Sequence, residues 1–540
     1  MPPVAATAGA AAPPRPSHVE PVDVAEIARL IDAGLLELPG GSGGRLRVTG
    51  VTLRAQQVRP GDLFAALPGA RAHGADFVAQ ALAAGAVAVL TDPAGAERPA
   101  LRDAPEVTGG RVAVLVHPDP RAVLGAVAAR IYRDPSSRLS LIGVTGTAGK
   151  TTVTTLVEAG LRSAGLTTGL IGTVRTLVAD EELASAFTTP EAPDLQALLA
   201  VMVERGVTHV PMEVSSHALA LGRVAAARFA VGAFTNLSQD HLDFHTDMED
   251  YFAAKARLFD GRAAAEVVCV DDEWGRRLVG PDTITVSAPA GGAAPAADAT
   301  WRAVDVHVDP TGGQTFRALG PDGLDLPVTL RLPGAFNVGN ALLALACVHA
   351  AGIDPALAVP GISATGVPGR MERVDRGQDF VAVVDYSHKP AAVAAVLDTV
   401  REQLRRAGGD GRVAVVLGCG GDRDTAKRPI MGAEAARRAD LLVITDDNPR
   451  SEDPATIRAA MRTGALAVPA AERGEVREVG DRRQAIAEAV RWARPGDVVV
   501  VAGKGHETGQ EIAGVVHPFD DRQVLAEAID DLLGNRKEQV

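Results

Sequence analysis

Hydrophobic and polar residues follow a repeating order along most of this chain: a short apolar run, a polar or glycine-rich turn, then a segment with helical apolar spacing. Apolar runs such as 86–90 and 112–116 have the length and composition of buried strands. The segments with helical spacing are 22–36, 77–84 and 121–132. We therefore predict a small α/β domain over residues 19–138.

The same alternation continues in the middle of the chain, where an apolar strand at 139–145 leads through a glycine-rich turn into a helix. Further buried strands are expected near 208–214, 231–236 and 266–271. Strands that alternate with helices predict a mostly parallel, doubly wound sheet of the P-loop type. Residues 280–332 are rich in Gly and Pro with short strands, which predicts a smaller β subregion inside a central domain over 139–366.

A Gly/Pro-rich boundary at 361–369 separates this region from a third one. Four strong strand candidates follow, in the sequences FVAVVDY, VAVVLG, LLVITDD and DVVVVAG. Their spacing by helical segments predicts a Rossmann-like C-terminal domain over residues 367–540. The expected fold is therefore α/β with three domains.

Composition limits the class of protein further. A chain of 540 residues exceeds what one hydrophobic core usually organises, and its net charge of -13 argues against a non-specific nucleic-acid binder. The Pro/Ala-rich tail at 1–18 reads as disordered and lacks the features of a signal peptide. Because no stretch has the length needed to cross a bilayer, we expect no membrane insertion and a cytoplasmic protein. The three cysteines Cys269, Cys347 and Cys419 have neither disulfide nor zinc spacing, and we expect small buried thiols.

The strongest local signal is a phosphate-binding loop, GVTGTAGKTT at 143–152, between an apolar strand and a helix. Its glycines let backbone N–H groups approach phosphate oxygens at a helix N-terminus. Lys150 would pair with the β- and γ-phosphates, and the Thr151 hydroxyl would ligate magnesium. The spacing departs from the common pattern because Val144 stands where a glycine is usual. The alternative is a strand–helix turn that merely needs glycines.

Six further motifs follow this loop in the chain. They are Thr188-Thr189-Pro190, Glu213-Val-Ser215-Ser-His217, Thr235-Asn236-Leu-Ser-Gln-Asp240-His241-Leu-Asp-Phe-His245, Tyr251-Phe-Ala-Ala-Lys255, Gly334-Ala-Phe-Asn337-Val-Gly-Asn340 and Asp385-Tyr386-Ser-His388-Lys-Pro390. Together with the loop they resemble the motifs of the Mur ligase family, in that family's order, from about residue 45 to 510. Ala148 departs from the family loop, where Asn is usual.

The resemblance implies an ATP-dependent ligase in which a substrate carboxylate attacks the γ-phosphate and an amine then displaces phosphate from the acyl phosphate. It implies catalytic roles for Lys150, Lys255 and His241, and magnesium ligation by Thr151, Glu213, His241 and Lys255. Lys255 matches the lysine that is carbamylated to N6-carboxylysine; the alternative is a solvated lysine on a helix. The implied ATP-binding residues are Gly146, Thr147, Gly149, Lys150, Thr151, Thr152, Asn337, Asn340, Arg370, Asp385 and His388.

Polar residues that follow strands of the third domain imply an amino-acid pocket. Asp447-Asn-Pro-Arg450 resembles the motif of the diaminopimelate-adding members of the family. An arginine fork suits the distal carboxylate of meso-diaminopimelate, which lysine lacks. The alternative for these four residues is a turn. The implied pocket consists of Arg423, Asp447, Asn448, Arg450, Gly503 and Glu507.

The UDP-linked substrate is expected between the first two domains. By resemblance it would contact Leu53, His73, Thr188, Thr189, Ser215 and Arg223. Leu53 and Leu221 stand where the family commonly has other residues. These departures concern the individual contacts with the UDP-linked substrate and not the class of reaction.

The implied function is addition of meso-diaminopimelate to UDP-MurNAc-L-Ala-D-Glu by a monomer, in peptidoglycan precursor synthesis. A lysine-adding ligase on the same scaffold is the nearest alternative, and Arg450 opposes it. A folylpolyglutamate synthase, a P-loop switch or transport ATPase and a scaffold protein are the others. The N-terminal domain argues against a folylpolyglutamate synthase, and the amino-acid-binding domain argues against a P-loop switch or transport ATPase. The many polar residues that follow strands argue against a scaffold protein.

Overall fold

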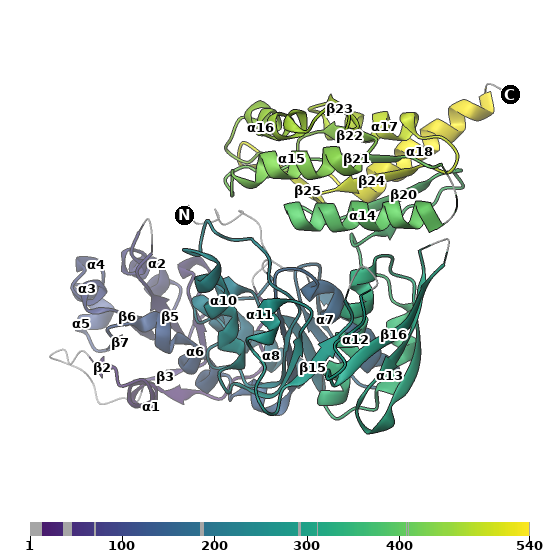
Figure 1. Ribbon diagram of the computed structural model, residues 1–540. Helices are drawn as coiled ribbons and strands as arrows, with labels where there is room; N and C mark the ends of the chain where they lie inside the picture. Colours follow the sequence, from purple (N-terminus) through teal and green to yellow (C-terminus); the bar gives the residue numbers. More distant parts are fainter. Residues whose placement is uncertain are drawn as a thin grey trace.

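The computed structural model describes residues 13–35, 46–69, 72–183, 188–289, 293–309, 312–406, 408 and 410–538, with side chains as far as Gly534. Three large sheets of five, eleven and six strands each pack against helices (Figure 1). The sheets follow one another along the chain without exchanging strands. The predicted α/β class with three domains is therefore confirmed.

The first sheet has the order β2-β7-β6-β5-β4, with β4 to β7 parallel and β2 antiparallel. Its strands are β2 (Gly34–Leu35), β4 (Gly50–Thr52), β5 (Asp62–Ala66), β6 (Ala88–Thr91) and β7 (Ala113–Val116), and the main helices are α1 (Val24–Leu30), α2 (Val78–Ala83) and α6 (Pro120–Ile131). The helix expected over 22–36 is shorter than predicted because Asp32 adopts a left-handed conformation, φ 51°, and β2 follows. Leu36 lies outside the described residues. Of the expected tail, residues 13–18 are described, and Arg15 pairs with Asp62 at 2.7 Å.

The central sheet is parallel through its middle strands. These are β9 (Gly169–Ile171), β12 (His209–Glu213), β8 (Ser140–Thr145), β13 (Phe229–Phe234), β14 (Ala263–Cys269) and β15 (Ile284–Ser287). The β subregion expected over 280–332 belongs to this same sheet, because β15 pairs with β16 (Trp301–Val308) and extends it into an antiparallel edge. That edge is completed by β17 (Gln314–Leu319) and β18 (Asp325–Leu330), and the opposite edge by β10 (Thr176–Val178) and β11 (Glu181–Leu183).

Two helices on one face of the central sheet form its main core. They are α7 (Lys150–Ser163), which follows the glycine-rich loop, and α12 (Ala335–Ala350). Val153, Leu342 and Trp301 are fully buried in one cluster with the strands. Each such aliphatic side chain contributes about 1.5–3 kcal/mol on burial. The packing fixes α7, and with it the loop at its N-terminus.

The third sheet has the order β19-β20-β24-β21-β22-β23 and is parallel except at β19. Its strands are β19 (Glu372–Arg373), β20 (Val381–Asp385), β21 (Val413–Leu417), β22 (Leu441–Ile444), β23 (Glu475–Glu478) and β24 (Val498–Ala502). Its helices are α14 (Pro390–Arg406), α15 (Lys427–Arg438), α16 (Pro454–Ala467), α17 (Arg482–Trp492) and α18 (Asp521–Glu538), and a hairpin of β25 (Gly509–Ile512) and β26 (Val515–Pro518) precedes the last. α14 lies on the side of this domain that faces the central domain (Figure 1).

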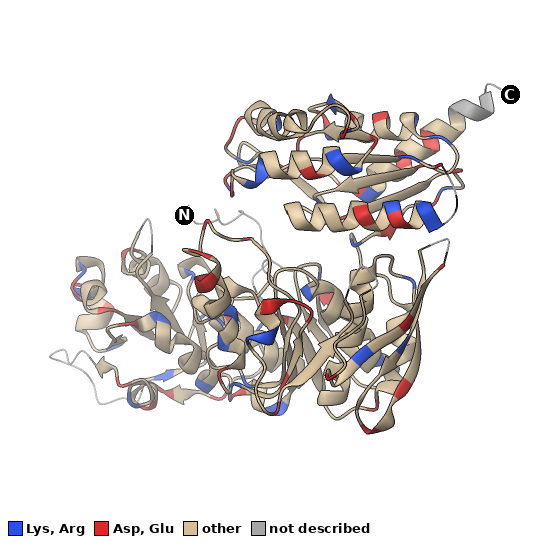
Figure 2. Ribbon diagram, viewed as in Figure 1, with Lys and Arg blue, Asp and Glu red and all other residues tan. Residues whose placement is uncertain are grey.

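Charged residues of both signs are interspersed over all three domains (Figure 2). In the described part of the chain, no helix is both long and apolar enough to span a bilayer. Cys347 and Cys419 are buried free thiols, as expected, whereas Cys269 is half-buried.

Candidate active site at the phosphate loop

The glycine-rich loop joins β8 to α7 in a conformation that depends on its glycines. Gly146 and Gly149 have φ angles of 140° and 87°. A Cβ at Gly149 would lie 2.5 Å from Asn340 Oδ1, and one at Gly146 would lie 1.9 Å from Thr235 Oγ1. Asn236 braces the loop at the unusual Ala148, because its Oδ1 accepts from the Ala148 N–H at 3.0 Å and its Nδ2 donates to the Ala148 carbonyl at 3.2 Å.

Lys150, the first residue of α7, folds its ammonium back over the loop. Its Nζ donates to the carbonyls of Gly146 at 2.9 Å and Thr147 at 3.2 Å. Burial, together with the nearby Lys389, lowers the pKa of Lys150 to about 8. An anion bound at the loop would therefore gain a strong, poorly solvated partner.

Thr151 and Glu213 provide neighbouring oxygen atoms beside the loop. The Thr151 hydroxyl donates to Glu213 Oε1 at 3.0 Å, and Arg370 donates to the same hydroxyl at 3.2 Å. Thr173 holds the carboxylate by donating its backbone N–H to Oε1 at 2.7 Å and its hydroxyl to Oε2 at 3.1 Å. Magnesium prefers hydroxyl and carboxylate oxygens of this kind, so these two side chains fit the metal.

Lys255 lies inside the protein, which excludes the solvated-lysine alternative. It belongs to α10 (Met248–Ala256), is 1 % exposed, and donates to the Gly146 carbonyl at 2.8 Å. Burial, then Lys150 and Lys389, lowers its pKa well below the usual value. Burial of this kind favours the neutral amine over the ammonium.

His241 lies on the same side of the loop in a left-handed backbone conformation, φ 54°. Its Nε2 is 3.0 Å from Asp240 Oδ2, and burial lowers its pKa to about 2 against the opposing effect of Asp240. The ring centroids of His241 and Tyr251 are 6.0 Å apart, and Lys255 Nζ lies 4.6 Å from the Tyr251 ring. Among the described residues, no three His, Cys, Asp or Glu side chains are grouped as a ready metal site. The second metal ligand set of His241 and Lys255 stays a prediction.

The remaining predicted ATP residues surround the loop from two domains. Asn337 and Asn340 are buried on α12 and bond to each other at 2.9 Å. From the C-terminal domain, the Arg370 guanidinium lies 4.5 Å from the Tyr386 ring. Asp385 is buried and accepts the Met371 N–H at 2.8 Å.

His388 lies beyond β20, next to Tyr386. Its Nδ1 is 2.7 Å from the Tyr386 carbonyl. Burial lowers the pKa of His388 to about 3, so the ring is neutral at physiological pH. Thr147 and Thr152 are buried within the loop and the first turn of α7.

The predicted amino-acid pocket is assembled at the carboxyl ends of β22 and β24. Asn448 Nδ2 donates to Glu507 Oε2 at 2.9 Å, and Lys504 Nζ reaches Asn448 Oδ1 at 3.1 Å and Glu507 Oε2 at 3.2 Å. A Cβ at Gly503 would lie 3.2 Å from Asp447 Oδ2, so this glycine admits the carboxylate. Four of the six predicted residues are thus brought together.

Arg450 and Arg423 lie on the neighbouring loops. Arg450 donates to the Gly421 carbonyl at 2.7 Å, and its Nε is 3.4 Å from Glu511 Oε2. Its backbone is left-handed, φ 54°, and forms a parallel bridge with Ile512. Arg423 is exposed on the loop after β21, where a Cβ at Gly420 would lie 3.0 Å from Arg450 Nη1 and 3.9 Å from Arg423 Cγ.

The residues predicted to hold the UDP-linked peptide divide into two groups. The central group is contiguous with Glu213: Thr189 Oγ1 donates to the Glu213 carbonyl at 2.8 Å and accepts the Ser215 N–H at 3.2 Å. The hydroxyl oxygens of Thr173 and Thr188 are 2.9 Å apart, and Arg223 donates to the Thr189 carbonyl at 3.1 Å.

The N-terminal group, Leu53 and His73, is not joined to these contacts. Leu53 packs on the core of the first domain. His73 is buried, accepts the Ala75 N–H at 3.0 Å and lies 2.9 Å from Asp92. Both ring nitrogens therefore have partners inside the protein, and the uracil contact stays a prediction.

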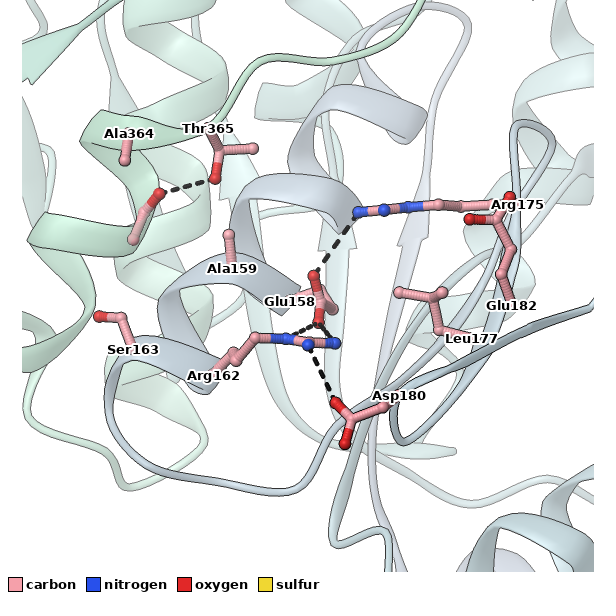
Figure 3. Close-up of a pocket in the computed structure, with 11 residues that line it drawn as sticks. Glu158, Ala159, Arg162, Ser163, Arg175, Leu177, Asp180, Glu182, Ala364 and Thr365 are labelled. Atoms are coloured by element: carbon pink, nitrogen blue, oxygen red, sulfur yellow. Dashed lines mark hydrogen bonds and ion pairs between the residues drawn. The ribbon is translucent and has the colours of Figure 1, made fainter.

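A hollow of about 530 Å³ lies on another side of α7, away from the loop (Figure 3). The buried Glu158 carboxylate is the central acidic group of this hollow. Arg162 donates to its Oε1 at 2.9 Å, Thr168 donates to the same atom at 2.8 Å, and Arg175 lies 3.7 Å from its Oε2. Since its charges are paired with one another, we assign the hollow a structural role in fixing α7.

Sequence reasoning missed several residues that this geometry makes prominent: Thr173, Asp240, Lys389 and Lys504. Asp240, Lys389 and Lys504 lie within or beside motifs already recognised, so position in the motif could have found them. Thr173 lies in a short loop after β9 without a recognised motif, and only the fold places it against Glu213.

Comparison with known proteins covers nearly the whole chain. Residues 47–132 match the model described as Mur ligase family, catalytic domain; residues 144–348 match the Mur ligase middle domain; and residues 369–505 match the Mur ligase, glutamate ligase domain. The UDP-N-acetylmuramoyl-L-alanyl-D-glutamate–2,6-diaminopimelate ligase of Streptomyces coelicolor is 55% identical over 519 residues, 96% of this chain and 98% of that protein. The ligase of the same name from Streptomyces avermitilis is 54% identical over 527 residues, 97% and 99% of the two chains.

A solved structure of a protein with that name is 32% identical, with a TM-score of 0.63, and covers 95% of this chain and 100% of that one. Sequence identity above 50% over nearly the full length, together with three matching family models in order, identifies the family of this chain. The chain belongs to the Mur ligase family of ATP-dependent, amide-bond-forming ligases.

Proposed function

We propose that this chain joins meso-diaminopimelate to the D-glutamate γ-carboxylate of UDP-MurNAc-L-Ala-D-Glu in peptidoglycan precursor synthesis. The carboxylate would attack the γ-phosphate of ATP and release ADP, and the amine would then displace phosphate from the acyl phosphate. The observation that carries this proposal is the contact of Asn448 with Glu507, with Arg450, two residues after Asn448, bound to the Gly421 carbonyl, in a chain 55% identical to a diaminopimelate ligase.

The first step brings two anions together, the substrate carboxylate and the γ-phosphate. The phosphate loop would supply the positive charge that this approach needs. Lys150 would move from the Gly146 and Thr147 carbonyls to the β- and γ-phosphate oxygens. Thr188, Thr189, Ser215 and Arg223 are placed beside Glu213, where the peptide carboxylate must approach.

Magnesium would be held by Thr151 and Glu213, with a second site at His241 and a carbamylated Lys255. Bound there, it would screen the repulsion between carboxylate and phosphate. Thr173 keeps the Glu213 carboxylate facing Thr151 through two hydrogen bonds. Asn337 and Asn340 would face the adenine, and Arg370, Asp385 and His388 would complete the nucleotide site.

The second step needs an amino acid held by both of its ends. Glu507 with Asn448 suits the distal ammonium of meso-diaminopimelate, and Arg450 with Arg423 suits the distal carboxylate. Asp447 and Gly503 complete the pocket. Lysine has no distal carboxylate, so it would leave Arg450 without that partner.

The domain division proposed is 19–138 for the UDP end, 139–366 for ATP and 367–540 for the amino acid, which agrees with the three sheets. Since the phosphate loop and the amino-acid pocket lie in one chain, a monomer suffices, and we propose that it acts in the cytoplasm. Size-exclusion chromatography with light scattering tests the monomer.

The experiment that tests the reaction is phosphate release from ATP with magnesium and UDP-MurNAc-L-Ala-D-Glu, comparing meso-diaminopimelate with L-lysine. Release with diaminopimelate alone, together with the tripeptide mass, is expected. Preference for lysine would overturn the specificity, and no release with either would overturn the reaction.

A further inference from the structure

The loop that carries Lys389 reaches from the C-terminal domain to the phosphate loop of the central domain. Lys389 directly precedes α14, the helix that faces the central domain (Figure 1). Its Nζ donates to the Thr147 carbonyl at 3.3 Å, the oxygen that also accepts from Lys150 at 3.2 Å. Two ammonium groups from different domains therefore meet at one carbonyl of the loop.

Among the described residues, the acidic partner of Lys389 is Asp240, whose Oδ2 lies 2.5 Å from Nζ. Both side chains are largely buried, at 14% and 11% exposure. Asp240 also lies 3.0 Å from His241, so it does not serve Lys389 alone. The Thr147 carbonyl and the two nearby carboxylates, Asp240 and Glu213, compensate the charges of Lys150 and Lys389 only in part, because poorly solvated like charges repel each other.

We propose that Lys389 is a phosphate-contacting residue of the ATP site, which holds the γ-phosphate from the side opposite Lys150. The inference rests on the ATP site of the proposed function and adds a contact to it. The ion pair with Asp240 holds the Lys389 ammonium at the loop. When the triphosphate binds, its terminal oxygens lie between the two ammonium groups and replace the Thr147 carbonyl as their acceptor.

Through this contact, the position of the C-terminal domain would depend on whether ATP or ADP is bound. The bond to a γ-phosphate joins the C-terminal domain to the loop, and ADP offers no oxygen at that place. The two domains are thus held together more strongly by ATP than by ADP, which favours release of the C-terminal domain once the amine has displaced phosphate.

The test is calorimetric binding of AMP-PNP and of ADP, each with magnesium, to the full chain and to Lys389→Met. We expect Lys389→Met to weaken AMP-PNP binding by about 10- to 150-fold, the loss of one hydrogen bond to a charged group, and ADP binding by less than about threefold. Equal losses for the two nucleotides, or no loss, would overturn the proposal. Because no peptide or amino acid is present, this result is independent of whether the proposed ligation succeeds.

Two further variants separate a phosphate contact from a structural role. Lys427→Met removes a neighbouring ammonium that donates to the His388 carbonyl at 3.0 Å, and it should leave the ratio of the two affinities unchanged. Asp240→Asn removes the carboxylate partner and should retain the preference for AMP-PNP over ADP. If Asp240→Asn loses that preference as fully as Lys389→Met does, Lys389 acts only as the partner of Asp240 and the proposal fails.

Discussion

The ammonium groups of Lys150 and Lys255 donate hydrogen bonds to the same acceptor, the carbonyl of Gly146, at 2.9 and 2.8 Å. Lys150 is the first residue of α7, and Lys255 lies near the end of α10. Lys255 is 109 residues away from Gly146 in the sequence. Two charged amines at one oxygen repel each other, and each lowers the stability of the charged form of the other. The arrangement is favourable when Lys255 is neutral or is converted into an anion.

Replacement of Lys150 by Ala should abolish turnover. The substitution removes the cation that the loop offers to the β- and γ-phosphates, and loss of one such electrostatic contact lowers kcat by about 100- to 1,000-fold or more. Phosphate release under saturating substrates measures it, with thermal unfolding as the control for folding. Turnover near that of the parent would remove the assignment of the loop.

Replacement of Lys255 by Ala should also remove activity, and excess bicarbonate should not restore it. In the parent, we expect the amine to add CO₂ and release a proton, and the resulting anionic carbamate would place a carboxylate beside the loop. Mass spectrometry under native conditions should show the added CO₂ on the parent and none on the variant. An unmodified parent with a fully active variant would contradict this role.

The sequence predicted the strands, the order of the domains and the phosphate loop, because apolar runs and glycine spacing are local signals. Of the residues found by motif, Glu213 contacts Thr151 and Asn448 contacts Glu507, while the roles of these residues stay predictions. The contact between Thr173 and Glu213 could not be predicted, because it depends on the register of β9 beside β12. The sequence predicts a smaller β subregion over 280–332 but not the pairing of β16 with β15, since short strands rich in Gly and Pro do not reveal which sheet they join.

Replacement of Arg450 by Ala should weaken the use of meso-diaminopimelate and spare that of ATP. A lost hydrogen bond between charged groups costs about 1.5–3 kcal/mol, so the KM for diaminopimelate should rise by about 10- to 150-fold. Arg450→Lys is the matched control, because it keeps the charge and loses the fork that binds a carboxylate with two parallel bonds. Kinetics with each substrate varied in turn provide the measurement, and an unchanged KM for diaminopimelate would remove the specificity argument.

Replacement of Asp521 by Ala should destabilise the C-terminal domain. Asp521 and Arg482 are fully buried and form two hydrogen bonds of 2.7 Å, from Nε and Nη2 of the arginine. Removing the carboxylate leaves a guanidinium without its counter-charge inside the protein, which costs about 3–5 kcal/mol. Asp530→Ala is the matched control on the same helix, because its pair with Arg376 is exposed and contributes little. Chemical denaturation followed by circular dichroism should show a lower midpoint for the first variant alone. Equal midpoints would show that the buried pair is not what holds α17 against α18.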